Sequence, residues 1–493
     1  DISDYYGIDP TFGTMEDFDE LLSEIHKRDM RIIRDLVINH TSDEHEWFKK
    51  SRQRIEPYTD YYIWRPGKGN KLPNNWDSLF EGKAWKYDEV RKEYYMHLFA
   101  IEQADLNMDN PLVREEVKKT LKFWLDMGVD GFRCDVINVI SKDQRYKNGR
   151  NPFILVGKKY FINGPKLHEY LYELNKDVLS KYDCMTVGET VFTNLEDVKL
   201  MTAENRNELS MVFNFDHTSV DNFLGVKWLM RKFSLKRFKK ILDKYQYGLK
   251  DIGWNSLFYE NHDQRRSVGR FNTDDDKYRV ESAKLLATTM YFLKGTPFIY
   301  QGQEIGMTNI PIYDINDYDD VEVHGFYKDY VLEKKVLTHE EFLYGCNKEA
   351  RDNNRTPIQW NNKVNAGWND GAKPWLKINP NYTYINAESQ INDPNSIYSF
   401  YKKLLHLRKS NEYNEVFTYG KFNDFIKEQK NVFVYSRETE SKKVLVVTNM
   451  RDCVEKVELP IIIKKTLLSN YDRNYTSSTI SLLPYESLVL EIE

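Results

Sequence analysis

The chain has 493 residues, with 71 basic and 76 acidic side chains and a formal net charge of -5. This length allows a large core and more than one domain, and the balanced charge argues against nucleic acid or an anionic membrane as a partner. No apolar run approaches the length of a membrane span, and the four cysteines are far apart and form no C-x-x-C pair, which favours free thiols. We therefore expect a cytoplasmic protein, monomeric, whose partners include neither nucleic acid nor a membrane.

The first elements alternate between helix and strand. Thr14 followed by Asp17 predicts a capped helix that ends near Asp29. A buried strand is predicted over 31–40, and its polar tail is expected to leave the sheet. Residues 41–110 then break the pattern with many aromatic side chains among Gly, Pro and Asn. This stretch is too long for a structureless loop, so we expect an inserted domain B there, with residues 1–40 as the first part of the main domain.

The alternation resumes after the inserted stretch. Asn110 and Pro111 predict the start of a helix that closes at Gly128, and further helices are predicted near 165–174, 238–242 and 278–292. Six buried strands are predicted, ending near His40, Asp135, Glu189, Phe215, Asp263 and Gln301. Polar clusters at the carboxyl ends of alternating strands indicate a parallel α/β architecture.

An eight-stranded (β/α)8 TIM barrel requires two more strands than these six. The chain opens abruptly in a loop-like segment at Asp1. We therefore predict that the first two barrel strands lie upstream of residue 1. The second part of the barrel would occupy 111–411, with a polar excursion over 310–360. After that, short strands predict a C-terminal antiparallel β-sandwich domain over 412–493.

The chemistry begins with the short strand Val129–Val136, which carries Arg133 and Asp135 near its end. Side chains alternate along a strand, so these two point the same way. The cation favours the ionised form of the carboxylate, which suits a nucleophile. Taken alone, such a pair would more often be a buried structural ion pair.

Carboxylates at two other strand ends change this weighting. In a barrel the carboxyl ends of the strands share one face, so Asp135, Glu189 and Asp263 would converge. Retaining glycoside hydrolysis uses one ionised and one protonated carboxyl group about 5 Å apart. Asp135 would be the nucleophile and Glu189, whose partial burial favours the protonated form, the acid. Asp263 would stabilise positive charge on the sugar ring, and His40 and His262 would donate hydrogen bonds to sugar hydroxyls.

Four runs of the chain resemble the signature regions of glycoside hydrolase family 13, the α-amylase family, and they stand in the order typical of that family. They are Asp35–His40, Gly131–Asp135, Val187–Glu189 and Asn261–Asp263. Neighbouring phrases resemble the oligo-1,6-glucosidase and α-glucosidase branch: Thr41–His45, Gln103–Asn107, Ile299–Gly306 and Arg355–Trp360.

The resemblance implies the same roles for the three carboxylates and adds further sugar-binding residues. His40, Arg133 and His262 would contact the sugar. Arg355 would hold the terminal glucose and so create an exo-acting pocket, and Phe80 would wall that pocket. The resemblance implies no required cofactor and no metal ligand among these residues. The acidic loop that holds a structural metal in relatives would lie upstream of residue 1.

Val136, the residue after the nucleophile, carries the linkage hypothesis. In this branch Val there goes with α-1,6 cleavage and Thr or Ala with α-1,4 cleavage, although a valine would also be unremarkable in a core. We expect a retaining exo-acting α-glucosidase that acts on small oligosaccharides with α-1,6 linkages. A trehalose-6-phosphate hydrolase, with a phosphate held by Arg265 and Arg266 or by Lys142, stays open as an alternative. So do an α-1,4- or sucrose-acting α-glucosidase or isomerase, and, from another class, a non-catalytic transporter subunit.

Overall fold

The structure is a computed structural model that describes residues 1–493 except 70, 81, 151–154, 224–225 and 427–428. The chain folds into two compact units, Asp1–Phe215 and Asp216–Glu493. The predicted domain bounds are finer than this division and stay predictions.

The first helices form where local capping signals predict them. Helix α1 (Met15–His26) has a reciprocal capping box, in which the Thr14 hydroxyl accepts from the Asp17 N–H and the Asp17 carboxylate from the Thr14 N–H. It ends three residues before the predicted Asp29, which has a positive φ of 53°. Helix α3 (Pro111–Asp126) is capped by Asn110, has Pro111 in its first turn and is followed by Gly128 with φ 105°. Its predicted inward face is buried: Val113, Val117, Leu121 and Trp124.

A four-stranded parallel sheet forms the core of the unit Asp1–Phe215. Its order is β1 (Arg34–Leu36), β7 (Gly131–Cys134), β8 (Met185–Glu189) and β9 (Met211–Phe213). Helices α3, α4 (Leu167–Asp177) and α5 (Leu195–Thr202) lie between these strands in the sequence. The predicted alternation of parallel strand and helix is therefore present. The two strands predicted upstream of Asp1 stay a prediction.

The strand predicted over 31–40 is wrong in its extent. Only Arg34–Leu36 pairs with the parallel sheet, whereas β2 (His40–Ser42) turns away and pairs antiparallel with β6 (Gln103–Asp105). The apolar residues Leu36, Val37 and Ile38 continue beyond β1, but the chain changes its pairing partner before His40. His40 is consequently held at the start of a separate two-stranded ribbon.

The stretch between β2 and β6 has a fold of its own. It contains α2 (Glu46–Arg52) and a three-stranded antiparallel sheet of order β3 (Trp64–Arg65), β5 (Glu93–Met96), β4 (Trp85–Asp88). Most of its aromatic residues serve as core: Trp64, Trp76 and Trp85 are all at most 4% exposed.

The unit Asp216–Glu493 opens with an antiparallel pair, β10 (Asn222–Phe223) and β11 (Val226–Met230), and then contains a short parallel pair, β12 (Ser256–Leu257) and β13 (Thr296–Pro297). The latter two are shorter than the predicted strands 254–259 and 297–300, and Pro297 has no N–H to extend the ladder. Helices of this unit include α6 (Leu235–Gly248), α7 (Ser267–Phe271), α8 (Arg279–Tyr291), α11 (Ala387–Ile391), α12 (Ile397–Lys409) and α13 (Asn414–Thr418). The excursion 310–360 forms α9 (Val321–Tyr327), a π-helix over Lys328–Glu333 and α10 (His339–Glu349) around its own apolar cluster.

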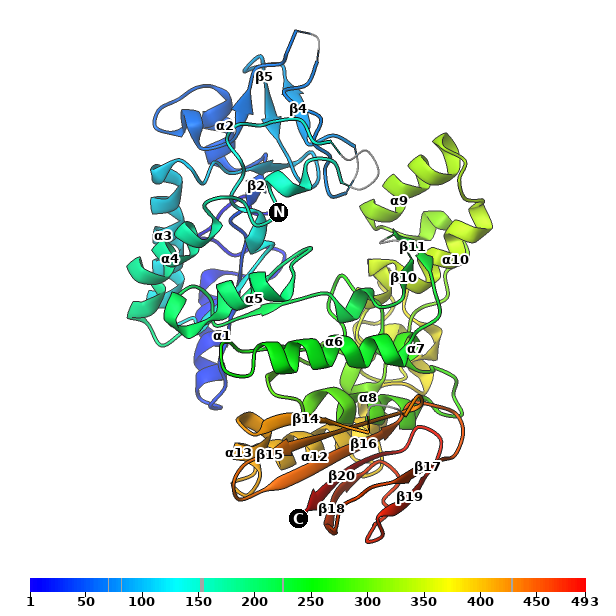
Figure 1. The fold of residues 1–493 in the computed structure, drawn as a ribbon. Helices are drawn as coiled ribbons and strands as arrows, with labels where there is room; N and C mark the ends of the chain where they lie inside the picture. Colours follow the sequence, from blue (N-terminus) through cyan, green and yellow to red (C-terminus); the bar gives the residue numbers. More distant parts are fainter. Residues whose placement is uncertain (70, 81, 151–154, 224–225, 427–428) are drawn as a thin grey trace. The chain divides into compact units, whose positions relative to one another are not determined.

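The C-terminal strands form the predicted antiparallel β-domain. The main sheet has the order β14 (Lys421–Phe425), β15 (Val432–Glu438), β16 (Lys443–Asn449), β20 (Ser487–Ile492), β18 (Ile463–Ser469), and β17 (Glu455–Glu458) pairs with β19 (Thr479–Leu482). One face of the main sheet packs on α8 and α12, and the other packs on the β17–β19 pair (Figure 1). The four cysteines are free thiols, as expected.

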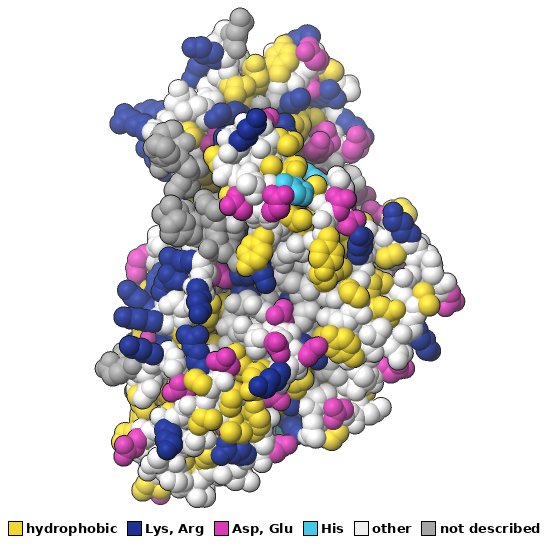
Figure 2. Space-filling model, turned by 90° about the vertical axis from the view of Figure 1, so that its right-hand side faces the viewer, with side chains coloured by type: hydrophobic (Ala, Val, Ile, Leu, Met, Phe, Trp, Pro, Cys, Tyr) yellow, Lys and Arg dark blue, Asp and Glu magenta, His cyan; other side chains and the backbone are white. Residues whose placement is uncertain are grey.

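In the view of Figure 2 both basic and acidic side chains are present, and basic ones gather along the left-hand edge. Within the described part of the chain, no helix combines the length and the apolar character that a bilayer crossing requires.

Two glycines around β7 differ in how much room a side chain would have. A Cβ on Gly131 (φ 150°) would lie 2.0 Å from the backbone oxygen of Met185, whereas a Cβ on Gly128 (φ 105°) would meet only side-chain atoms at 3.5 Å or more. We expect Gly128→Ala to lower the free energy of unfolding by about 1–2 kcal/mol, from backbone conformation alone.

Gly131→Ala should cost clearly more, because β8 must move away from β7. Urea denaturation followed by circular dichroism compares the two variants under the same conditions. Equal midpoints for the two would contradict the close approach of these strands.

Candidate active site

One guanidinium group joins three carboxylates at the ends of neighbouring strands. Arg133, on β7, donates from Nη1 to Asp135 at 2.6 Å and to Asp35 at 2.8 Å, and from Nη2 to Glu189 at 2.7 Å. The side chains of Arg133, Asp135 and Glu189 are 16%, 21% and 8% exposed. The structure thus brings together the predicted nucleophile, the predicted acid and the predicted arginine.

The sheet register produces this arrangement. Asp35 on β1 is the parallel partner of Arg133, and Val187 on β8 is its partner on the other side. Glu189 follows two residues beyond Val187 and therefore lies on the same face of the sheet. The signature run Asp35–His40 does not predict this role for Asp35, because its place beside Arg133 depends on pairing between distant segments.

The backbone immediately after the nucleophile also contacts the acid. Val136 has φ 33° and ψ 43°, in the left-handed region that β-branched residues rarely adopt. In this conformation its N–H donates to the Glu189 carboxylate at 3.2 Å, while its side chain is 6% exposed within an apolar cluster. Val136 is thus not the last residue of the strand but a buried turn that positions Glu189.

The electrostatics differ in one respect from the sequence expectation, which paired Arg133 with Asp135 alone. Burial lowers the pKa of Arg133, but the carboxylates of Glu189, Asp135 and Asp35 more than offset this, so the pKa is raised overall. One positive charge therefore faces three carboxylates. Glu189 is buried as predicted, but it is paired with a cation as well.

His40 lies in a wall of aromatic side chains in the same unit. Its ring is 5.3 Å from the ring of Phe99, which in turn makes an edge contact with Phe80 at 5.5 Å. One imidazole nitrogen lies 3.2 Å from the Gln103 amide nitrogen. Burial lowers the pKa of His40 to about 4, although Asp105 opposes this, so the ring is neutral at neutral pH. Phe80 is half-buried beside the Val136 cluster.

A buried ion pair between Lys142 and Asp105 lies next to His40, because Asp105 is the ladder partner of His40. The Lys142 ammonium lies 2.9 Å from Asp105 and donates to the Asn39 side-chain oxygen at 2.6 Å. Both ions are almost fully buried, at 1% and 0% side-chain exposure. Lys142 was considered as a phosphate anchor, and the structure contradicts this, because its charge is already used inside the protein.

The second group of predicted residues lies in the unit Asp216–Glu493, beyond the end of β12. Asp263 accepts from Arg355 at 2.6 Å, and His262 lies 3.2 Å from its other carboxylate oxygen. Arg355 also donates through Nε to the backbone oxygen of His262 at 2.9 Å. Asp263, His262 and Arg355 are therefore brought together, as the sequence predicted.

Arg351 is a further member of this group that the sequence interpretation missed. It lies 3.5 Å from Asp263 and is gripped by Asp320 through its Nε and Nη2 atoms. Burial raises the pKa of Asp263, but His262, Arg351 and Arg355 more than offset it and lower the pKa overall. The spacing of four residues between Arg351 and Arg355 is the feature of the sequence that could have indicated that Arg351 belongs to this group. No feature of the sequence indicated the same for Asp320, which lies in the excursion 310–360.

Arg265 and Arg266 were the other candidates for a phosphate site, and the structure contradicts this as well. Both are buried, at 4% and 1% exposure. Arg265 pairs with Asp221 and with Glu349 at 3.0 Å, and Arg266 lies 3.5 Å from Glu260. Their charges stabilise the interior and do not face a ligand.

Comparison with known proteins places this geometry in a family. Residues 1–420 match the family described as alpha amylase, catalytic domain, and residues 432–489 match the alpha-amylase SusG C-terminal domain. An oligo-1,6-glucosidase of Parageobacillus thermoglucosidasius is 47% identical over 502 residues, with 100% of this chain and 88% of that protein covered.

Two further relatives show how the branch varies. A trehalose-6-phosphate hydrolase of Bacillus subtilis (strain 168) is 42% identical, with 100% of this chain and 88% of that protein covered. The crystal structure of an isomaltulose synthase from Klebsiella sp. LX3 matches with a TM-score of 0.95 at 40% identity, covering 100% of this chain and 89% of that one. The chain belongs to the α-amylase family, glycoside hydrolase family 13, in the oligo-1,6-glucosidase and α-glucosidase branch, and is a glycoside hydrolase with a (β/α)8 barrel and a C-terminal β-domain.

Proposed function

We propose that the protein is a retaining, exo-acting α-glucosidase that removes the terminal α-1,6-linked glucose from short isomalto-oligosaccharides. The observation that carries this proposal is the contact of one guanidinium with both Asp135 and Glu189. Two carboxylates that share one cation stand close together, in keeping with the separation of roughly 5–5.5 Å that retaining glycosidases use.

In the first step Asp135 attacks the anomeric carbon of the terminal glucose while Glu189 gives its proton to the glycosidic oxygen. The bond to the leaving sugar breaks, and a glycosyl ester forms on Asp135. Arg133 makes one charge available to two carboxylates, and the charge on Asp135 disfavours a second charge on Glu189. The proposed first step requires Asp135 to be ionised and Glu189 to carry the proton.

In the second step Glu189, now ionised, removes a proton from a water molecule that attacks the same carbon. The ester to Asp135 breaks, and glucose leaves with its original configuration. The Val136 N–H and Arg133 both contact the Glu189 carboxylate, so they stabilise its ionised form at this stage. Val136 acts here through its backbone.

Asp263 is proposed to act as an ionised group that stabilises the positive charge on the sugar ring. Arg355, Arg351 and His262 keep it charged. Arg355 is proposed to hold the terminal glucose, with His40 and His262 on its hydroxyls and Phe80 in the pocket wall. In these roles the protein acts on a small oligosaccharide without a cofactor, as a monomer.

Three alternatives within the family differ in substrate or acceptor. A trehalose-6-phosphate hydrolase would need a phosphate site, and the cations suggested for it, Lys142, Arg265 and Arg266, are buried in internal ion pairs. A preference for α-1,4 linkages would contradict the association of Val136 with α-1,6 cleavage. An isomerase would use a sugar in place of water in the second step. The α-1,6 hydrolase is favoured by Val136 and by several curated oligo-1,6-glucosidases at 45–47% identity.

Replacement of the nucleophile tests the mechanism. We expect Asp135→Asn to lower kcat on isomaltose by about 10⁴-fold, because the amide cannot form the glycosyl ester. Proton NMR of the first product formed by the unmodified chain should show α-glucose. Release of β-glucose, or undiminished activity of the variant, would overturn the proposed mechanism.

Arg133→Lys tests the shared cation. An ammonium is a compact point charge and cannot reproduce the fork that contacts both carboxylates. We expect kcat to fall by about 10²-fold, as misplacement of reacting groups by about 1 Å does, with circular dichroism unchanged. Arg145→Lys, on a half-exposed pair with Asp143 in the same unit, is the matched control and should keep full activity.

Val136→Thr tests the linkage hypothesis with a change of one methyl to one hydroxyl. We expect the unmodified chain to prefer isomaltose over maltose, sucrose and trehalose-6-phosphate. The variant should raise the maltose-to-isomaltose ratio of kcat/KM by about tenfold, the scale of one methyl group in a pocket. A preference of the unmodified chain for maltose would contradict the role of Val136, and a preference for trehalose-6-phosphate would contradict the substrate class.

A further inference from the structure

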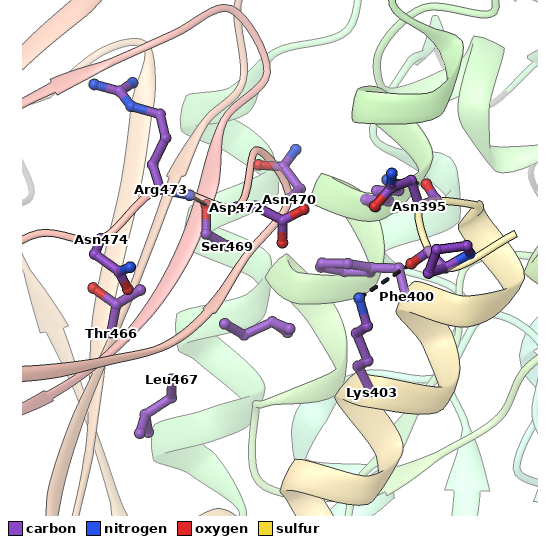
Figure 3. Close-up of a pocket in the computed structure, with 13 residues that line it drawn as sticks. Asn395, Phe400, Lys403, Thr466, Leu467, Ser469, Asn470, Asp472, Arg473 and Asn474 are labelled. Carbon is purple, nitrogen blue, oxygen red and sulfur yellow. Dashed lines mark hydrogen bonds between the residues drawn. The ribbon is translucent and has the colours of Figure 1, made fainter.

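A cavity of about 250 Å³ lies within the unit Asp216–Glu493, where α8 and α12 meet β18 and the loop that follows it. At roughly 30 Å³ per water molecule this is space for about eight waters, which is comparable with one hexose ring. None of the proposed catalytic or sugar-binding residues lines it. Figure 3 shows its lining side chains.

One wall of the cavity is apolar and is built on α12. Phe400 is only 4% exposed and lies in the apolar cluster that joins α8 and α12 to the sheet. The Lys284 ammonium on α8 is 5.8 Å from the Phe400 ring and donates to the backbone oxygen of Asn395 at 2.6 Å. Lys284 is itself 7% exposed, and burial lowers its pKa. A buried cation at the wall of an aqueous cavity provides donors in a fixed position.

Hydrogen-bonding groups of both kinds line other parts of the cavity. Asp472 has φ 52°, and its carboxylate points toward the space beside Phe400 (Figure 3). Lys403 points into the same space from α12 and donates to the Pro394 backbone oxygen at 3.1 Å. The amide of Asn474 adds a further donor and acceptor to the lining.

Apart from Arg473, which is paired elsewhere, the lining carries Lys284 and Lys403 against Asp472, and the nearby carboxylates of Glu281 and Asp393 also act on Lys284, which leaves little excess charge to hold an anion. The Arg473 guanidinium points away and is paired with Glu486 at 2.9 Å. The carboxylates of Glu281, Asp472 and Asp393 act on Lys284 and oppose its loss of charge, while Lys403 acts in the other direction. Alternating donors and acceptors beside an apolar face suit the hydroxyl groups and the ring carbons of a sugar.

We propose that this cavity is an accessory site that binds one neutral hexose unit, either free glucose or the terminal glucosyl residue of a short oligosaccharide. The choice of a sugar rests on the proposed function, because such an enzyme works amid these molecules. A ligand there would contact α8, α12 and the loop after β18 at once, and so would tie the C-terminal β-domain to the helices beneath it.

The test is isothermal titration calorimetry of the full chain carrying Asp135→Asn, which keeps the sugars from being hydrolysed. Glucose, isomaltose and glucose 6-phosphate are the titrants. The double variant Asp472→Ala, Lys403→Ala should bind one glucose fewer than its parent. Lys402→Ala, the neighbouring exposed lysine on α12, which does not line the cavity, should bind the same number as the parent.

Binding of glucose alone points to the free sugar as the ligand, and binding of isomaltose as well points to a glucosyl residue. An unchanged stoichiometry in the double variant overturns the proposal, and so does a lost site that takes only glucose 6-phosphate. The double variant without Asp135→Asn should hydrolyse isomaltose with unchanged kcat/KM. If the proposed function is wrong, the active site should bind no glucose, and the number of glucose molecules bound per chain should fall in the parent and in the double variant alike. The parent should still bind one glucose more than the double variant.

Discussion

The Arg133 guanidinium is the interaction on which the first half of the site depends. It neutralises carboxylates from three adjacent strands, β1, β7 and β8, at the edge where those strands end. Without it, three like charges would face one another at the end of a parallel sheet, at a cost that close spacing makes large. The contact between Arg133 and Glu189 therefore depends on the register of the sheet. A shift of the register by one residue would turn Glu189 to the other face.

Val136, in the turn after the proposed nucleophile, packs its side chain in an apolar cluster and donates its N–H to Glu189. A valine in the left-handed region costs on the order of 1–3 kcal/mol, and it persists because burial of its side chain beside Phe99 and half-buried Phe80 holds it in place. The same conformation directs its N–H to Glu189. The aromatic cluster around Val136 thus helps to orient Glu189, the proposed acid.

Local patterns in the sequence were sufficient for part of this arrangement. The caps of α1 and α3 and the buried face of α3 follow from spacing alone, and the carboxylates at the ends of β7 and β8 follow from strand polarity. What failed depends on distant pairing or on burial. Asp35 and Asp320 gain their roles from segments far away in the chain. Lys142, Arg265 and Arg266 looked available to a phosphate because sequence does not show that each is buried against a carboxylate.

The two groups of residues place their carboxylates in different electrostatic surroundings. Asp135 and Glu189 share one cation, Arg133, with Asp35. Asp263 has the opposite surroundings, with Arg355 at 2.6 Å and Arg351 at 3.5 Å, and its pKa is lowered despite burial. A carboxylate that must give and take a proton needs the first environment, and one that must stay charged throughout needs the second. The charges around Asp263 therefore support its proposed role as stabiliser, whereas the proposed roles of Asp135 and Glu189 are supported by their shared contact with Arg133 and by the motifs.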